Sequence, residues 1–364
     1  MVKEPRLTSA AAAAPGSFRP GRRDCLWVAG AAAVLLGTGL PRLRAQPEVA
    51  RLRVVMGREE SLCHLPLTVA QQLGYFRAEG LDVRLLEVAE PASAAAAVQA
   101  GEAELGSGAY LGLVQRQLQG QTLQTVVLEG RTPKVSLGVC TRLMGSWRGM
   151  ADLRGKRIGV ATSGSLSQTL AQVCLARAGL KQADVQWVSF GSMAEGVQAL
   201  RWGGIDALSH LDPGMTQLEQ KGEVRVVADP RTPKGAHEVF GGPMPGTCVY
   251  AQPAFVSRHP QTCQAFVYAV ARSLRWLQTA QPQDIIKTVP EAQVMGDRAL
   301  YLASFYKVRE SYSPDGELGE EALQIAWKVA GAAVGETRHQ DLQALLERSH
   351  TNEFVLRARA RLKA

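Results

Sequence analysis

Several motifs that would indicate an enzyme or a metal site are missing from this 364-residue chain. It has no C-x-x-C pair, no G-x-S-x-G, no H-E-x-x-H and no G-x-x-x-x-G-K-[ST] phosphate loop. None of the five cysteines after residue 45 lies at metal-ligand spacing from a histidine. We therefore expect no metal and no cofactor, and no residue is predicted to be catalytic.

The chain also lacks a basic cluster interleaved with aromatic residues, the pattern typical of nucleic-acid binding. The formal net charge is +8, but residues 1–45 hold seven of the 41 basic and only two of the 33 acidic residues, which leaves about +3 for the rest. The basic run at 357–363 is interpreted as a solvated helix face. We therefore expect no nucleic-acid partner. The hydrophobic content of 46% indicates an ordinary globular protein of one to three domains.

The N-terminal apolar run, residues 26–40, is too short for a membrane span, which needs ~20 residues. It follows Arg22-Arg23-Asp24-Cys25-Leu26, an R-R-x-x-L twin-arginine pattern, and precedes Leu43-Arg44-Ala45, a loose match to a signal-peptidase site. Residues 1–45 are thus predicted to be a signal peptide that directs export to the periplasm and is removed. An uncleaved anchor is the alternative. The five remaining cysteines cannot all pair, and we interpret most of them as small buried apolar residues.

Beyond residue 45, patterns typical of strands and helices alternate. A strand at 51–57, a helix near 65–73, the helix-stopping Gly74 and Gly80 and a strand at 81–88 make one βαβ unit. Further strands are expected at 103–108, 123–130, 135–141, 157–162, 185–190, 206–210, 224–229 and 248–252, with helices at 93–100, 110–118, 165–178, 193–201 and 213–220. Beyond Pro253 the pattern is helical. The fold class is therefore α/β, with mostly parallel sheets flanked by helices.

Two such rounds of similar length predict two lobes, joined by crossings near 139–150 and 235–247. We assign residues 46–140 to the first part of lobe 1, 141–240 to lobe 2, and 241–364 to a return to lobe 1 with C-terminal helices. Because open α/β sheets bind ligands outside the carboxyl ends of their strands, two facing lobes should form a binding cleft.

Three segments carry a resemblance to a known family. They are P-x-x-x-A-x-x-x-G-Y-F-x-x-E-G-L-D-V (66–83), A-x-x-x-G-E-A-E-L-G (97–106) and D-L-R-G-K-R-I-G-V (152–160). This pattern resembles the periplasmic substrate-binding proteins of ABC importers in the nitrate/taurine/sulfonate (NitT/TauT) group, which share their type II binding-protein fold with thiamine-pyrimidine-precursor binders. One departure is Leu211-Asp212-Pro213, where many relatives have W-E-P. The resemblance implies a monomer that delivers a small polar or anionic solute to an inner-membrane ABC permease.

Candidate ligand contacts are expected in the loops that face the cleft. From the first lobe they are Ser61, His64, Ser93, Ser107, Gly108, Ala109, Tyr110 and Arg131, and from the second lobe Ser163, Gly164, Ser165, Ser167 and Asp212. Arg131 could clamp an anion with its planar fork, and the 163–167 turn could bind one at a helix N-terminus. Each has a structural alternative: capping for His64, Ser93, the 163–167 turn and Asp212, burial in the core for Tyr110, and solvation for Arg131.

Two other functions remain open at this point. An enzyme on the same fold, such as a pyrimidine-precursor synthase or a dehydratase, would need an acid/base set for which only His64, Arg131 and Asp212 are candidates. A ligand-sensing subunit of a membrane receptor would bind its solute in the same way.

Overall fold

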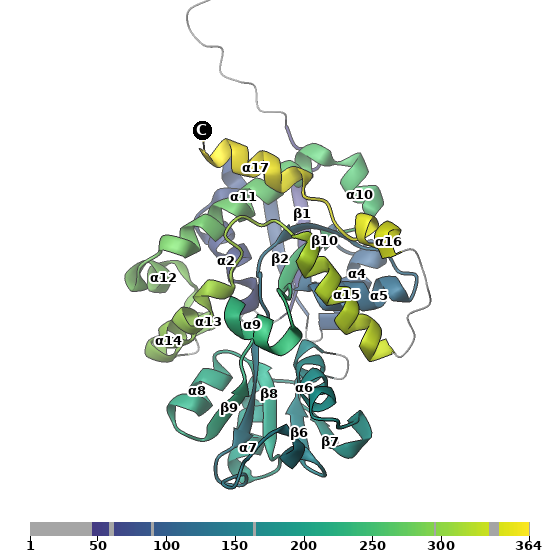
Figure 1. Cartoon of the computed structure of the whole chain (residues 1–364). Helices are drawn as coiled ribbons and strands as arrows, with labels where there is room; N and C mark the ends of the chain where they lie inside the picture. The colour runs from purple at the N-terminus through teal and green to yellow at the C-terminus, as the bar shows by residue number, and fades with distance from the viewer. Residues whose placement is uncertain are drawn as a thin grey trace, which may run out of the picture. The chain divides into compact units, whose positions relative to one another are not determined.

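The computed structural model describes residues 46–57, 62–88, 91–162, 165–294, 296–334 and 342–363, so the predicted signal peptide lies outside the described residues. Residues 46–364 form one compact unit that contains two five-stranded sheets, with strand orders β2-β1-β3-β10-β4 and β7-β6-β8-β5-β9. The two sheets belong to two lobes, as the sequence pattern predicted (Figure 1).

The first sheet consists of β1 (Arg51–Met56), β2 (Asp82–Glu87), β3 (Leu105–Ala109), β4 (Gln124–Leu128) and β10 (Thr247–Ala251). The second consists of β5 (Val135–Cys140), β6 (Arg157–Val160), β7 (Gln186–Ser189), β8 (Ala207–Leu211) and β9 (Val224–Ala228). The helices of the first half are α2 (Leu65–Gln72), α3 (Tyr75–Ala78), α4 (Pro91–Gln99), α5 (Tyr110–Leu118), α6 (Leu166–Arg177), α7 (Met193–Trp202), α8 (Gly214–Gln220) and α9 (Pro233–Phe240). Those of the C-terminal region are α10 (Pro253–Arg258), α11 (Pro260–Thr279), α12 (Pro282–Thr288), α13 (Glu291–Val294), α14 (Arg298–Val308), α15 (Glu320–Val334), α16 (Leu342–Ser349) and α17 (Glu353–Lys363). Short 3-10 turns lie at Leu62–His64, Met150–Leu153, Gln182–Asp184 and Arg309–Ser311.

Each sheet is covered by helices on both faces. In β1, alternate side chains point to opposite faces, so that Val54 belongs to the core under α2 and α11 while Val55 belongs to the core under α4 and α5. In the second lobe, α6 packs on one face and α7 and α8 on the other. The result is a helix–sheet–helix sandwich in each lobe, in agreement with the predicted α/β class.

The sheets are mixed, because one strand in each runs against its neighbours. β1 pairs in parallel with β2 and β3, whereas β10 is antiparallel to both β3 and β4. In the second sheet, β6 pairs in parallel with β7 and β8, and β5 is antiparallel to β8 and β9. β5 and β10 are the strands by which the chain enters each sheet from the other lobe, which explains their reversed direction.

The position of the first crossing corrects the sequence-based boundary at residue 140. Residues 135–140 were assigned to lobe 1, but β5 pairs with β8 and β9 and so belongs to lobe 2. The first crossing is therefore the segment 129–134, and not 139–150. The second crossing begins after β9 and contains α9, a helix that the sequence analysis did not predict.

The two crossings lie against each other. The backbone N–H groups of Glu129 and Gly130 donate to Thr247 O at 2.8 and 2.9 Å, and Gly246 N donates to Gly130 O at 2.8 Å. A Cβ on Gly246 would lie 2.3 Å from Thr132 O, so this close approach requires glycine. Thr132 Oγ1 donates to Arg231 O at 3.3 Å and joins the crossings nearer the second lobe.

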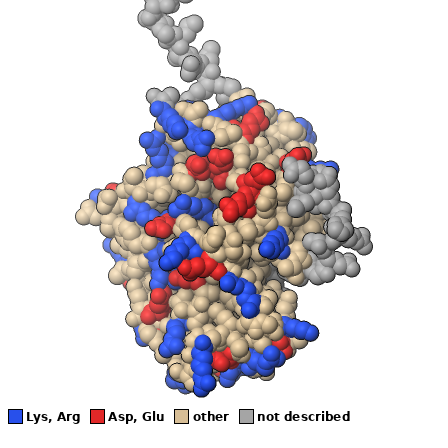
Figure 2. All heavy atoms as spheres, in the orientation of Figure 1, with Lys and Arg blue, Asp and Glu red and all other residues tan. Residues whose placement is uncertain are grey.

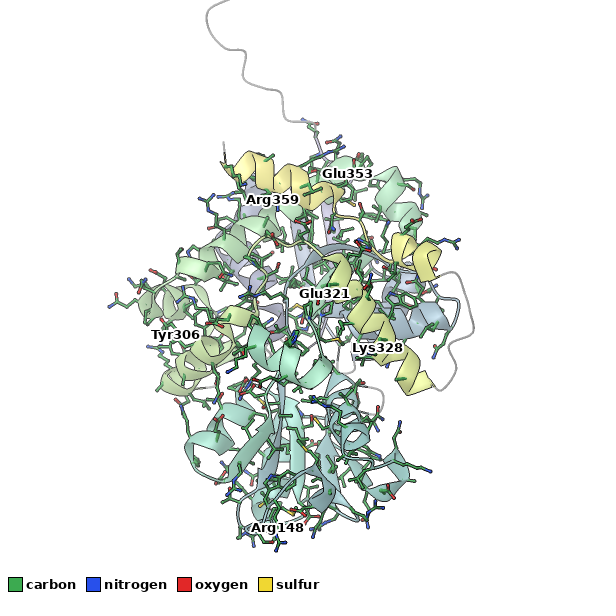
Figure 3. The ribbon with its side chains drawn as sticks, viewed as in Figure 1. Arg148, Tyr306, Glu321, Lys328, Glu353 and Arg359 are labelled. Carbon is green, nitrogen blue, oxygen red and sulfur yellow. The ribbon has the colours of Figure 1, made fainter. Side chains whose placement is uncertain are left out.

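The C-terminal helices return to lobe 1, as expected. α15, which carries Glu321 and Lys328, packs on α5, and α17 packs on α11 (Figure 3). Arg359 of α17 donates to Glu317 at 3.0 Å. None of the helices in the described segments has the length and apolar character needed to cross a membrane. On the face shown in Figure 2, basic and acidic side chains are interspersed. None of the five cysteines after residue 45 forms a disulfide with another, and all but Cys63 are buried.

Candidate functional site

A cavity of about 450 Å³ lies between the two lobes. Lobe 1 contributes the β3–α5 segment together with His64 and Tyr250, and lobe 2 contributes the loops that follow β6, β7 and β8. Lys134, at the end of the first crossing, also lines it. The cavity therefore occupies the cleft that the fold prediction placed outside the carboxyl ends of the strands, and its size suits a small organic molecule.

Lys134 is the cation of this cavity that lacks a polar partner. Its side chain is 2% exposed, and its Nζ has neither a hydrogen bond nor an ion pair among the described residues. The Nζ lies 4.2 Å from the centroid of the Tyr312 ring, which offers only a cation–π contact. Burial lowers the pKa of Lys134, against the opposing effects of Cys63 and Glu129. A buried ammonium group without a hydrogen-bond acceptor is costly, so an acceptor supplied by a ligand would stabilise it.

Next to Lys134, three side chains form a buried row. Ser107 Oγ donates to Glu129 Oε2 at 2.5 Å and lies 2.9 Å from His64 Nδ1. Because the hydroxyl proton goes to Glu129, the Ser107 oxygen accepts from His64, which places the imidazole proton on Nδ1. Burial, and then the charge of Lys134, lower the pKa of His64 to about 3, so this ring is neutral. Burial also raises the pKa of Glu129, against the effects of Ser107 and Lys134.

The turn before α6 supplies hydroxyl groups from the second lobe. Ser165 is the N-cap of α6 and accepts from Gln168 N at 3.4 Å, and its Oγ lies 2.8 Å from Ser167 Oγ. Ala161 N donates to Ser167 Oγ at 3.0 Å. Both serines line the cavity, and both also hold the local turn. The predicted contacts Ser163 and Gly164 lie outside the described residues.

The end of β8 brings His210 and Asp212 to the cavity. His210 Nδ1 accepts from Leu211 N at 2.9 Å, while its Nε2 has no partner within the described chain. Burial lowers the pKa of His210 to about 4, so this ring is also neutral at physiological pH. Asp212 is already well bonded: Thr216 N and Oγ1 donate to its Oδ1 at 2.9 and 2.6 Å, and Arg231 forms an ion pair with it.

Much of the remaining wall is apolar. Leu111 and Tyr250 lie on the lobe 1 side, and Leu166, Phe190 and Met193 on the lobe 2 side. Tyr250 packs flat on β3: a Cβ on Gly106 would meet the Tyr250 ring at 2.5 Å, so only glycine fits there. These side chains suit the carbon skeleton of a ligand, whereas the polar groups near Lys134 suit its charged end.

The structure brings seven of the thirteen predicted contact residues to the cavity. They are His64, Ser107, Gly108, Ala109, Ser165, Ser167 and Asp212. Ser61, like Ser163 and Gly164, lies outside the described residues.

Three predicted residues do not line the cavity. Ser93 is exposed on α4. Tyr110 is fully buried in the core, where its hydroxyl lies 3.0 Å from Ser349 Oγ, so the structural alternative describes it. Arg131 is exposed and donates from Nε to Glu310 O at 2.8 Å. Lys134, three residues further along the same crossing, lines the cavity instead of Arg131.

Sequence reasoning missed several residues of this cavity, among them Lys134, His210, Tyr250 and Phe190. The sequence did contain a signal for Lys134. This lysine directly precedes the apolar strand VSLGVC, so it lies either at the end of the strand or in a buried position. His210 lies between Ser209 and Leu211 in a strand whose residues are mostly buried. A polar ring in such a strand requires a hydrogen-bond partner or a ligand, and this was a signal for His210.

No group of His, Cys, Asp or Glu side chains with the geometry of a metal site occurs in the part of the chain that the structure describes. The polar groups of the cavity are instead Lys134, Arg116, which donates to Gln121 Oε1 at 2.9 Å, two neutral imidazoles, glutamine amides, hydroxyl groups and the compensated carboxylate of Asp212.

Comparison with known proteins places this arrangement in a family. A family model described as NMT1/THI5 like matches residues 62–285, more than half of the chain. The chain belongs to the NMT1/THI5-like family. A protein of Bordetella bronchiseptica RB50 with a solved structure is 36% identical, and the match covers 88% of this chain and all of that one with a TM-score of 0.80.

Solved structures with lower sequence identity share the fold of this chain. The alkanesulfonate-binding protein SsuA of Xanthomonas axonopodis pv. citri is 20% identical over 86% of this chain and 98% of its own, with a TM-score of 0.61. The periplasmic nitrate-binding protein NrtA of Synechocystis PCC 6803 is 13% identical over 87% and 90%, with a TM-score of 0.65. These likenesses confirm the predicted periplasmic-binding-protein fold.

A Haemophilus influenzae protein, assigned provisionally to thiamine biosynthesis, is 30% identical over 126 residues. That match covers 35% of this chain and 39% of the relative's length. The resemblance to solute-binding proteins that was read from the sequence is therefore confirmed at the level of family and fold.

Proposed function

We propose that this protein is the solute-binding component of an ABC importer and that it captures a small organic anion in the cavity between its lobes. The observation that carries the proposal is the unpaired ammonium group of Lys134 in a cavity with a largely apolar remainder. In this proposal Lys134 binds the anionic group by a charge-assisted hydrogen bond. Phe190, Met193 and Tyr250 surround the carbon skeleton.

Binding is a better account of these residues than catalysis. Ser107, the hydroxyl nearest to a histidine in the cavity, is 1% exposed and already donates its proton to Glu129. Asp212 is held by Arg231 and Thr216 and is not free to act as a base. The groups that could move protons therefore hold the wall of the cavity together, and we propose a non-enzymatic role.

Export and partners follow as further parts of the same proposal. Residues 1–45 would act as a twin-arginine signal, and the mature monomer would deliver its solute to a permease in the inner membrane. The intact mass of the exported protein tests the first step, and a mass beginning near Gln46 is expected. A protein that keeps residues 1–45 and stays in the membrane would contradict it.

The central test compares organic anions with their neutral isosteres in a melting-temperature screen, followed by calorimetry. Benzoate with benzamide, and benzenesulfonate with benzenesulfonamide, differ chiefly in charge. A ligand at ~100 times its Kd should add ~2.7 kcal/mol of stability. Lys134→Met should weaken binding of the anion by ~1.5–3 kcal/mol, the range for a hydrogen bond to a charged group, and leave the neutral isostere unaffected.

Arg131→Met is the matched control, because it removes a cation from the same crossing but from an exposed position outside the cavity. It should not change the affinity. Equal losses for the two variants, or none for Lys134→Met, would refute the role given to Lys134.

A further inference from the structure

Two buried, oppositely charged side chains stand at adjoining strand ends beside the cavity. Val135 of β5 and Leu211 of β8 are register partners; Lys134 directly precedes the first and Asp212 directly follows the second. Both side chains line the cavity, and each residue is only 2% exposed. A lysine and an aspartate so placed would be expected to form an ion pair, because a buried charge without a partner is costly. The described structure contains no such pair.

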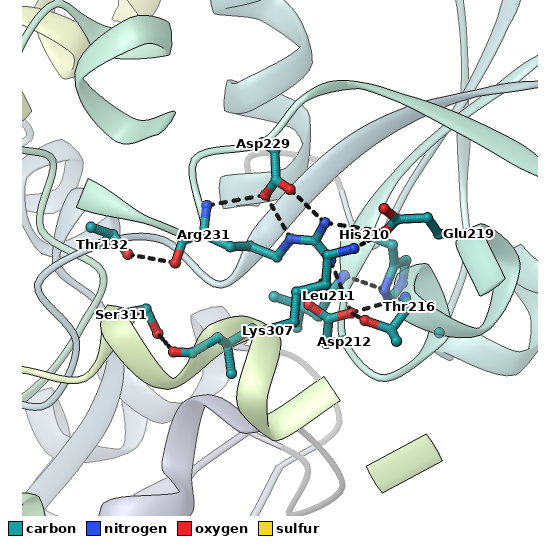
Figure 4. A network of polar contacts seen from close by, with 12 residues as sticks. Thr132, His210, Leu211, Asp212, Thr216, Glu219, Asp229, Arg231, Lys307 and Ser311 are labelled. Carbon is teal, nitrogen blue, oxygen red and sulfur yellow. Dashed lines mark hydrogen bonds and ion pairs between the residues drawn. The ribbon is translucent and has the colours of Figure 1, made fainter. Parts of the chain in front are cut away.

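Asp212 is paired with Arg231 instead. Arg231 Nη1 lies 3.2 Å from Asp212 Oδ1 and 3.0 Å from Oδ2 (Figure 4). With the two bonds from Thr216, Asp212 Oδ1 accepts three hydrogen bonds. The charge of Asp212 is thus compensated within the protein. Lys134 forms no ion pair with it, and Glu129 is the carboxyl group whose charge acts on Lys134.

Arg231 is itself held firmly and away from the ligand space. It lies in the second crossing, it is fully buried, and it is not among the residues that line the cavity. Asp229 binds its other edge, with Nε–Oδ1 at 2.6 Å and Nη2–Oδ2 at 2.7 Å, and Glu219 lies 3.5 Å from Nη2. A guanidinium group can serve Asp212 and Asp229 at once because its donors form a planar fork, which an ammonium group lacks.

We propose that Arg231 determines the charge selectivity of the cavity: by taking up the charge of Asp212, it keeps the ammonium group of Lys134 free for the anionic group of a solute. The inference rests on the proposed function, in which Lys134 binds that anion. Arg231 acts as a positioning residue that touches no ligand. Without it, the unpaired Asp212, which flanks the register partner of Val135, is available to neutralise Lys134, and the cavity loses its preference for anions.

A double-mutant cycle tests this with benzoate, benzenesulfonate and their neutral amides as probes. In the wild-type background, Arg231→Met should lower the affinity for the anions about tenfold or more, since Asp212 then competes for Lys134. In the Asp212→Asn background, the same change should have less than about a twofold effect, because residue 212 then carries no charge that could compete. Affinity for the neutral amides should not follow this pattern. Equal losses in the two backgrounds would overturn the proposal.

A second variant and a measurement without ligand keep the proposal testable if Arg231→Met does not fold. Arg231→Lys keeps a buried cation beside Asp212 but loses the fork, so it should give a smaller loss in the wild-type background and none in Asp212→Asn. In an NMR titration of the lysine ε-methylene signals, Arg231→Lys should raise the pKa of Lys134 by bringing it under the influence of Asp212. An unchanged pKa would contradict the proposal.

Lys134→Met distinguishes a failure of the proposed anion site from a failure of the role given to Arg231. If this variant binds the anions as tightly as the wild type, the proposed anion site is wrong. If it loses the anions while Arg231→Met shows no dependence on Asp212, the anion site stands and only the role of Arg231 is refuted.

Discussion

Lys134 is a cationic side chain at a buried position, where desolvation disfavours its charged form. Desolvation lowers its pKa, and the neighbouring Cys63 and Glu129 oppose this effect without cancelling it. His64 and His210 beside it are neutral, because burial lowers the pKa of each well below its usual value. An anion that enters the cavity would therefore meet a single titrating cation, and its own charge would raise the pKa of that cation.

Anion binding should accordingly be coupled to proton uptake by Lys134. The affinity should be constant at pH values below the lowered pKa of Lys134 and should fall as the pH rises above it, because only the ammonium form donates to the anion. Calorimetry at alkaline pH, in two buffers with different enthalpies of ionisation, should give different apparent binding enthalpies for benzoate. The difference should shrink in Lys134→Met. Identical enthalpies in both buffers would show that Lys134 does not change its protonation.

The contacts of individual side chains were the feature hardest to predict from the sequence. The sequence analysis predicted that Arg131 would contact an anion. The side chain of Arg131 is exposed and donates to Glu310 O instead. Arg131 and Lys134 are three residues apart, and only the path of the chain between the sheets decides which one faces the cavity. Likewise, Asp212 was predicted at the cleft, but its compensation by Arg231 depends on a contact between residues 19 positions apart.

Among the elements, α9 in the second crossing has end signals that can be read from the sequence. Thr232 is its N-cap and accepts from Gly235 N at 3.1 Å, Pro233 occupies its first turn, and Gly241 ends it in the left-handed conformation. The sequence analysis treated this stretch as an irregular crossing and overlooked those signals. α9 follows directly on Asp229 and Arg231, so its start fixes the segment that holds the ion-pair network.

Gly235 ties α9 to this network through a close approach of two backbone segments. A Cβ at this position would lie 1.9 Å from Asp229 O. Gly235→Ala should therefore destabilise the protein by ~1–3 kcal/mol, even though alanine normally favours a helix. Gly112 of α5, whose added Cβ would meet nothing within 4 Å, is the matched control. Gly112→Ala should stabilise the ligand-free protein by ~0.5–1 kcal/mol. Denaturant unfolding should show opposite signs for the two variants; equal shifts would refute the close-approach argument.

Most elements outside the crossings were predictable, because they repeat a local pattern. The helix 110–118 and the strands near 51–57, 81–88 and 224–229 were found within two residues of their observed ends. Apolar periodicity and glycine stops determine these elements locally. The assignment of β5 to a lobe was wrong for a different reason: strand pairing is a long-range property, and residues 135–140 look the same in either sheet.

For the molecule as a whole, the lobes also meet outside the crossings. Lys307 of α14 in lobe 1 forms an ion pair with Glu219 of α8 in lobe 2 (Figure 4). Glu219 in turn lies 3.5 Å from Arg231 Nη2, which pairs with Asp212 at the cavity wall. A continuous set of charges thus runs from the cavity to the contact between α8 and α14. If the lobes separate when the cavity empties, the Lys307–Glu219 pair is one of the contacts that must break.

Removing this pair should favour the separated lobes. Both side chains are about one third exposed, so solvent screening limits the contribution of the pair to ~0.2–1 kcal/mol. Lys307→Met should therefore weaken anion binding by at most about fivefold, and small-angle scattering should give a larger radius of gyration for the ligand-free variant than for the wild type. Arg298→Met is the control, since it breaks the Arg298–Glu291 pair, which lies within lobe 1. Both changes remove one cation from the same helix, α14. A general effect of charge would therefore appear in both, whereas a contact that holds the lobes together predicts a change in Lys307→Met alone.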